Sequence, residues 1–161
     1  MLSGVKRAAF LFVALGLLDA VSAAQEVRIR VLDGRNGRPV RDEINVDFFE
    51  NDERGIDIGH RHNWRWLTPR TDKDGVIQVR LEPTDKYITV EPAETIDCRL
   101  KRKERPDLLH PPLSSVAEII HSGIVLENHC GEVQAVPGPG ELVFFVKPLH
   151  WWQKFLGGLF S

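Results

Sequence analysis

The residues best suited to chemistry gather in one short segment, HRHNWRW at residues 60–66. Side chains of an extended chain alternate between two sides, so a strand here would place His60, His62, Trp64 and Trp66 on one face. The imidazoles are potential metal ligands. The indoles could stack on sugar rings or on a protein partner, because each combines a large apolar area with one hydrogen-bond donor. We therefore take these four residues as the candidate ligand-binding residues.

A plainer interpretation of the two Trp side chains is that they belong to the hydrophobic core. Trp is highly buried on average, so this interpretation is favoured over an exposed pair. A carbohydrate-binding surface at Trp64 and Trp66 is the alternative. The exposure of these side chains distinguishes the two.

Histidines elsewhere in the chain offer further metal ligands, but nothing in the sequence brings them together. Isolated histidines are more often surface or hydrogen-bonded side chains than ligands. We therefore expect no metal site and no cofactor, and we rank a small metal-dependent hydrolase below the other functions. The histidines outside residues 60–66 are His110, His121, His129 and His150.

Two short motifs are better explained by turns and helix ends than by catalysis or calcium binding. The nucleophile elbow G-x-S-x-G is absent, and the sequence HSG at residues 121–123 lies where a helix is expected to end. The sequence DKDG at residues 72–75 starts like a calcium loop, but its glycine comes too early and Pro83 stands where the bidentate Glu belongs. We therefore assign no catalytic residues.

The elements that must position these side chains are β-strands, indicated by alternating apolar and polar residues. Residues 87–90 are expected to form a hairpin with the strand before them, and residues 94–100 to add a short strand. Turn sequences rich in Asp, Asn and Gly follow the first strand and precede the third. The strands predicted most directly lie at residues 27–31, 44–48, 77–81 and 142–146.

The strand at residues 142–146 is apolar at every position, so both of its faces must be covered. One candidate cover is a short helix after Ser115, where a capping box with Glu118 predicts the start and Gly123 the end. The other is the aromatic tail at residues 149–161, whose apolar side chains fall on one side of a helical wheel. We expect the tail to pack on the sandwich rather than to contact a membrane surface, because few cations accompany it.

The first 24 residues have the three parts of a secretory signal peptide. Lys6 and Arg7 form a positive region, residues 8–18 an apolar region, and residues 21–24 a small-residue cleavage site. The apolar run is too short to span a bilayer. We therefore expect an exported protein, periplasmic or secreted.

Export makes the two cysteines informative, because oxidising compartments favour pairing. Cys98 and Cys130 are expected to form a disulfide. Two separately buried thiols are the alternative, since spacing alone does not bring the two Cα atoms within bonding range.

A spaced set of turn and strand residues extends over residues 27–90. Its members are Val31, Asp33, Gly37, Pro39, Val40, Thr71, Asp72, Gly75, Leu81 and residues 87–90. In this set the chain resembles the carboxypeptidase regulatory-like domain, a member of the transthyretin-like β-sandwich group. The resemblance implies a mainly β, transthyretin-like or Ig-like sandwich. Such modules serve as structural, adhesive or ligand-binding appendages.

We therefore expect a sandwich domain at residues 25–148, with an insertion at residues 98–130 that contains the short helix. The formal net charge of −2 argues against a nucleic-acid partner. The function expected is an exported, non-catalytic binding or structural module of the cell envelope or exterior, with a protein or glycan partner. The alternative is the carbohydrate-binding module described above.

Overall fold

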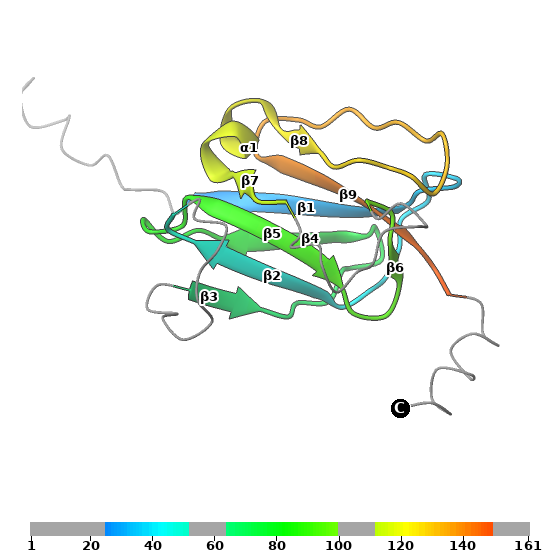
Figure 1. The fold of residues 1–161 in the computed structure, drawn as a ribbon, viewed down its shortest axis with the longest axis horizontal. Helices are drawn as coiled ribbons and strands as arrows, with labels where there is room; N and C mark the ends of the chain where they lie inside the picture. Colours follow the sequence, from blue (N-terminus) through cyan, green and yellow to red (C-terminus); the bar gives the residue numbers. More distant parts are fainter. Residues whose placement is uncertain (1–24, 52–63, 100–111, 150–161) are drawn as a thin grey trace, which may run out of the picture.

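The computed structural model describes residues 25–51, 64–99 and 112–149, and these form two β-sheets packed face to face (Figure 1). The first sheet has the order β4 (Val76–Arg80), β1 (Glu26–Asp33), β9 (Glu141–Lys147), β6 (Ile96–Asp97), with β8 (Ile124–Val125) also paired to β9. The second has the order β3 (Trp64–Leu67), β2 (Ile44–Phe49), β5 (Tyr87–Pro92), β7 (Ser114–Ser115). The prediction of a mainly β sandwich is confirmed.

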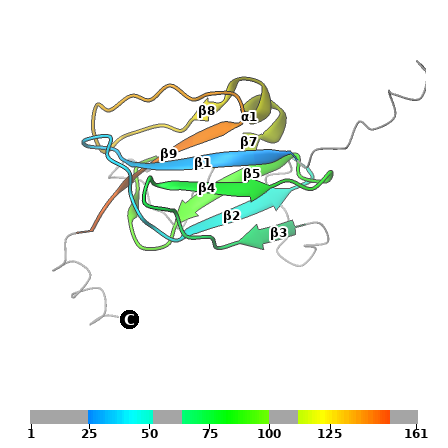
Figure 2. The ribbon, with the colours of Figure 1, turned by 180° about the vertical axis from the view of Figure 1, so that it is seen from behind.

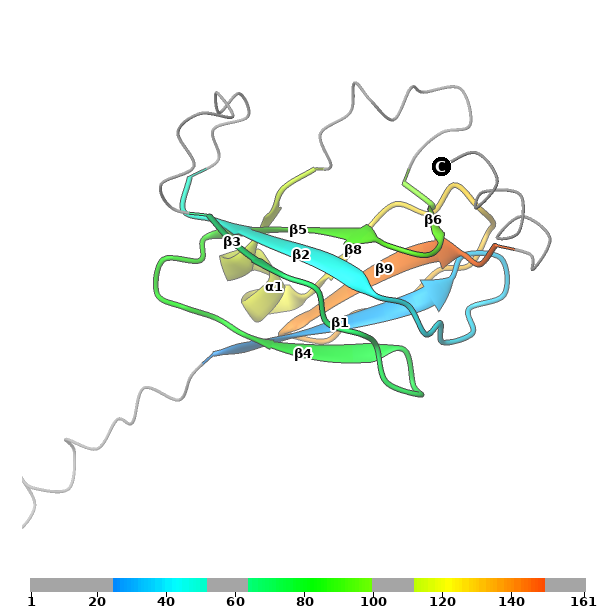
Figure 3. The ribbon, with the colours of Figure 1, turned by 90° about the horizontal axis from the view of Figure 1, so that it is seen from below.

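The core lies between the two layers, which Figure 3 shows with β2, β3 and β5 on one side and β1 and β4 on the other. Alternation explains which side chains enter it: in β1, Val27, Ile29 and Val31 are buried, whereas Arg28 is exposed and Arg30 half-buried. Burial of each such apolar side chain stabilises the fold by roughly 1.5–3 kcal/mol. The largest core side chains are Phe48, Phe144, Ile29, Ile44, Ile88, Ile119 and Leu142.

The expected hairpin between the strand at residues 77–81 and the strand at residues 87–90 is wrong. β4 pairs with β1 in the first sheet, whereas β5 pairs with β2 in the second. The connection between them crosses the end of the core, where Leu81 is buried and its N–H donates to the carbonyl of Gln25 at 2.8 Å. Within this connection, the side chain of Asp85 accepts a hydrogen bond from the N–H of Glu82 at 2.8 Å. The short strand expected at residues 94–100 is present only as β6.

The helix α1 (Val116–Ser122) begins and ends where the sequence predicts. The hydroxyl of Ser115 accepts from the N–H of Glu118, and Gly123 ends the helix with a φ of 76°. Val116 and Ile119 are buried in the core, so α1 covers the core beside the start of β9 (Figure 2). No helix in residues 25–51, 64–99 and 112–149 has the length and apolarity of a membrane span.

The outward side of β9 is covered by the segment after β8, which we call the strap (residues 126–136). Val143 and Phe145 point away from the core and pack with Leu32 and Cys98. The strap contributes the partly buried residues Cys130, Val133 and Ala135 to the same cluster, and Figure 1 shows it running alongside β9. The sequence proposed α1 or the tail as the cover, but α1 packs on the core side. Residues 150–161 of the tail lie outside the described residues, as do residues 1–24.

The strap is fixed by a covalent bond and by side-chain hydrogen bonds. Cys98 and Cys130 form the predicted disulfide. The amide of Asn128 donates to the carbonyls of Gly34 at 2.8 Å and Val133 at 3.0 Å. A Cβ on Gly131 would lie 2.5 Å from the carbonyl oxygen of Gly34. The strap therefore packs directly on the turn that follows β1.

Candidate functional site

The structure places two of the four candidate ligand-binding residues and contradicts the core interpretation of one of them. Trp66 is 58% exposed. Trp64 begins β3 and pairs with Phe49 through the backbone. His60 and His62 lie outside the described residues. The core interpretation of Trp66 is therefore wrong.

Strand pairing explains why Trp66 points outward. Trp66 is the register partner of Asp47. Asp47 alternates in β2 with the buried residues Val46 and Phe48, so it lies on the side of the sheet away from the core. Residues directly opposite each other in an antiparallel pair project from the same face.

Arg65, next to Trp66, points inward. Its guanidinium carbon lies 4.0 Å from the centroid of the Phe48 ring, a cation–π contact that is favourable at the edge of a core. The same guanidinium forms an ion pair with Asp85 and donates to the carbonyl of Arg80 at 3.1 Å. These contacts hold β3 with its arginine toward the core and its tryptophan toward solvent. The average burial of Trp had favoured the reverse.

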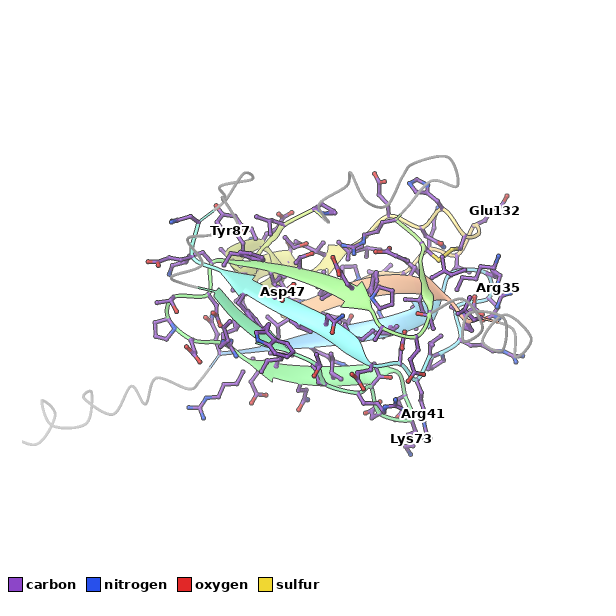
Figure 4. All side chains as sticks on the ribbon, turned by 60° about the horizontal axis from the view of Figure 1, so that its bottom comes forward. Arg35, Arg41, Asp47, Lys73, Tyr87 and Glu132 are labelled. Atoms are coloured by element: carbon purple, nitrogen blue, oxygen red, sulfur yellow. A yellow bond between two sulfur atoms is a disulfide. The ribbon has the colours of Figure 1, made fainter. Side chains whose placement is uncertain are left out.

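The outward side of β2, β3 and β5 combines aromatic and polar side chains, and we call it the outer face. One row across the three strands contains Trp66, Asp47 and Thr89 in register, and the next contains Phe49 and Tyr87. Figure 4 shows Asp47 near the middle of this sheet and Tyr87 at its end. The members of the outer face are Asn45, Asp47, Phe49, Trp66, Tyr87, Thr89 and Glu91.

Thr89 is an unusual member of the outer face, because it is only 5% exposed. Its hydroxyl oxygen is buried and has no hydrogen-bond partner among the described residues. A buried polar group without a partner costs roughly 1–3 kcal/mol. The hydroxyl is therefore an unexplained polar atom beside Asp47.

A depression of about 750 Å³ continues the outer face around the end of the sandwich. Tyr87 belongs to both, since it lies on the outer face and also lines the depression. Ligand sites combine apolar lining with a few polar groups, and this lining has both kinds. Its apolar members include Leu81, Val116 and Ile120, and its polar members include Gln25, Glu50, Asn51, Glu82, Asp85, Lys86 and Ser115.

Among the described residues, carboxylates outnumber cations around the outer face and the depression. The carboxylate of Asp85 is paired with Arg65, which also lies 3.4 Å from a carboxylate oxygen of Glu82. The ammonium of Lys86 donates to the carbonyl of Pro83 at 2.9 Å. Among the described residues, the guanidinium of Arg65 and the ammonium of Lys86 are thus engaged within the chain.

The chemistry that this arrangement supports is binding by stacking and hydrogen bonding. In the part of the chain that the structure describes, no three His, Cys, Asp or Glu residues are grouped as metal ligands. Both cysteines are in the disulfide. Sequence reasoning found Trp66 but missed Asp47, Thr89 and Tyr87, because only the strand register brings them beside it.

Comparison of the chain with protein-family models, with curated proteins and with solved structures gave no match in any of the three.

Proposed function

We propose that this protein is an exported, non-catalytic binding module of the cell envelope or exterior, and that it binds through the outer face. The single observation that carries the proposal is the exposure of Trp66 on a sheet face that also presents Asp47 and Tyr87. Exposed Trp and Tyr side chains are the residues most enriched in binding sites, because they bury large areas at low entropic cost. The resemblance of residues 27–90 to carboxypeptidase regulatory-like domains supports an accessory binding role.

Export is supported by two independent features of the chain. Residues 1–24 have the composition of a secretory signal peptide. The Cys98–Cys130 disulfide is of the kind that persists in oxidising compartments and is rare in the cytosol. A signal-like N-terminus and a disulfide thus both support export of the protein.

Site-specific photo-crosslinking in the producing cell tests the proposal. A photoreactive amino acid is placed at position 66, and at position 136 in a matched control, because Val136 is 88% exposed on the strap. We expect adducts of defined mass from position 66 in the envelope or medium fraction, and none from position 136. Equal adducts at both positions, no adduct at position 66, or recovery of the protein from the cytosol alone would contradict the proposal.

A further inference from the structure

We infer that two copies of this chain pair edge to edge through β3, about a two-fold axis that passes beside Trp66. Such a dimer goes beyond the proposed function, because it uses the backbone edge of β3 and not a ligand of the outer face. Three properties of the described residues lead to it: the outward backbone groups of β3, the protection of the other sheet edges, and the symmetry of the outward groups about Trp66.

The backbone of Trp66 faces away from β2, and β3 is the end strand of its sheet (Figure 1). In an antiparallel pair, residues that exchange hydrogen bonds alternate with residues that do not. The N–H of Ile44 donates to the carbonyl of Pro69 at 3.0 Å, which fixes the bonded positions of this pair. In the same register Trp66 lies opposite Asp47 at a position without such bonds. The N–H and C=O of Trp66 therefore point to the outer edge, and neither bonds to another described residue.

The end strand of the first sheet, β4, is largely closed by its own chain. The register with β1 turns the backbone groups of Val76, Gln78 and Arg80 outward. The N–H and C=O of Val76 bond to the side chain and the N–H of Asp72, both at 2.9 Å. The C=O of Arg80 accepts from the guanidinium of Arg65 at 3.1 Å. Among the described residues of β4, only Gln78 keeps both outward groups without a partner.

The other edges are too short to accept a partner strand. The strands β6, β7 and β8 have two residues each, and very short edge strands are one way in which proteins avoid pairing with other chains. The strand β3 has four residues and contains neither Lys nor Pro, which protect such edges. Its one charged residue, Arg65, is turned inward and forms an ion pair with Asp85. Among the described edges, β3 is thus the one best able to pair.

The outward groups of β3 are self-complementary. Antiparallel pairing centred on Trp66 sets this residue opposite Trp66 of the second copy, and sets Trp64 opposite Thr68. A pair centred on one residue has two-fold symmetry, the commonest symmetry of protein oligomers. The two Trp66 residues exchange both N–H···O=C bonds, with Cα atoms about 5.5 Å apart. Arg65 falls opposite Leu67 of the second copy, so no like charges face each other within β3.

Pairing also accounts for the exposed indole of Trp66. The side chain is 58% exposed in the single chain, and residues directly opposite in an antiparallel pair project from the same face. The two indoles therefore lie side by side, and aromatic pairs contribute beyond the area that they bury. The joined sheet has four strands from each copy. Because contact through one short strand is at the small end of interface sizes, we expect a Kd of about 10–100 µM.

Sedimentation velocity of the oxidised protein, purified from the producing cell, measures the pairing between about 5 and 500 µM, a range that brackets this Kd. We expect the mass to rise from one chain to two. Amide exchange measured by NMR on the same samples locates the contact. The N–H of Trp66 should exchange about five-fold more slowly at the highest concentration, because pairing gives it a hydrogen bond. The N–H of Gln78, the matched edge amide of β4, should exchange at the same rate at both ends of the range.

Charge exchange at position 66 tests the register. Trp66→Lys and Trp66→Glu should each sediment as one chain at the highest concentration, because like charges directly opposite each other repel. An equimolar mixture should recover dimers that contain one copy of each, identified by native mass spectrometry. Gln78→Lys puts the same charge on the other edge and should dimerise as the unchanged protein does. Circular dichroism checks that each variant is folded, and the amide exchange of the unchanged protein decides if one is not.

The outcomes separate this dimer from the proposed function. One chain at every concentration overturns the dimer, and so does a dimer that Trp66→Lys leaves intact or Gln78→Lys abolishes. A mixture that fails to recover dimers overturns the pairing centred on Trp66. In the crosslinking experiment at position 66, the dimer gives an adduct of twice the chain mass, whereas a ligand of the outer face gives an adduct of another mass. Either proposal can therefore fail while the other stands.

Discussion

The two outward surfaces of the sandwich differ in composition and in whether the chain covers them. On the first sheet, Phe145 and its neighbours are apolar and are covered by the strap, which the disulfide holds in place. On the second sheet, Trp66 is exposed and lies beside Asp47. An apolar surface without cover favours aggregation, whereas a mixed aromatic and polar surface remains compatible with water. The difference shows that one surface is buried under the strap, and it agrees with the proposal that the other surface binds a ligand.

The strongest test of this comparison removes one large side chain from each surface. Phe145→Ala should lower the free energy of unfolding by about 3–5 kcal/mol, because Phe145 is fully buried beneath the strap. Phe49→Ala on the outer face should cost less than half as much, because Phe49 is only partly buried. Urea unfolding monitored by circular dichroism measures both losses. Equal losses would show that the two surfaces do not differ.

Removal of the disulfide tests whether the strap depends on it. Replacing both Cys98 and Cys130 with Ala should lower the free energy of unfolding by roughly 3–4 kcal/mol, the value expected for opening a loop of this length. Binding of a fluorescent dye that recognises exposed apolar surface should increase, because the apolar cluster around Phe145 is uncovered. Reduction of the unchanged protein with dithiothreitol should reproduce both effects. The NMR signal of Trp66 should not move, and a shift there would show that the two surfaces are coupled.

Acid sensitivity should belong to the strap side of the molecule. Hydrogen bonds from the Arg35 guanidinium and N–H hold the pKa of Asp33 below its usual value, against the opposing effect of burial. A carboxylate with a lowered folded-state pKa contributes stability that is complete above its unfolded pKa of about 3.9 and is lost as the pH falls through the folded value.

Asp33→Asn should therefore lower the free energy of unfolding by about 1 kcal/mol at pH 7. It should also remove the part of the acid-induced loss of stability below pH 4 that Asp33 causes. Urea midpoints between pH 2 and pH 7 measure the effect. Glu132→Gln, on the exposed part of the strap, provides the control. If the stability of Asp33→Asn fell with decreasing pH as steeply as that of the unchanged protein, Asp33 would not be a source of the acid sensitivity.

The smallest expected change in stability concerns Trp66. Trp66→Ala should alter the free energy of unfolding by no more than about 0.5 kcal/mol, because exposed positions away from packing and capping contribute little. The same urea titration measures it. A loss above about 2 kcal/mol would mean that the indole supports the fold, which would weaken its assignment to binding.

The sequence predicted the parts of the fold that depend on local patterns. Alternation located β1, β2 and β4, and the capping box with Gly123 located α1, because both signals lie within a few residues. The disulfide was predictable from compartment and cysteine number. The prediction of a hairpin between β4 and β5 was wrong, because the order of two strands along the chain does not determine which sheet each of them joins.

The candidate site was predicted only in part. Trp66 stood out by residue type, but its exposure depended on Arg65 turning inward to Phe48 and Asp85. An arginine directed toward a core contradicts the usual polarity of a strand, so the average burial of Trp predicted the wrong face. Tyr87 and Thr89 lie on the same face as Trp66 because β5 pairs with β2. This pairing brings together distant segments of the chain, and no local sequence pattern predicts it.

The parallel pairing of β1 with β9 has a consequence for the order of folding. Val31 pairs with Phe144 near the middle of the first sheet, so the last of the described strands fills the position between β1 and β6. A chain that leaves the ribosome N-terminus first cannot complete this sheet until residue 147 has been made. Contacts between such distant segments slow folding. The first sheet should thus be completed only after β9 has been made.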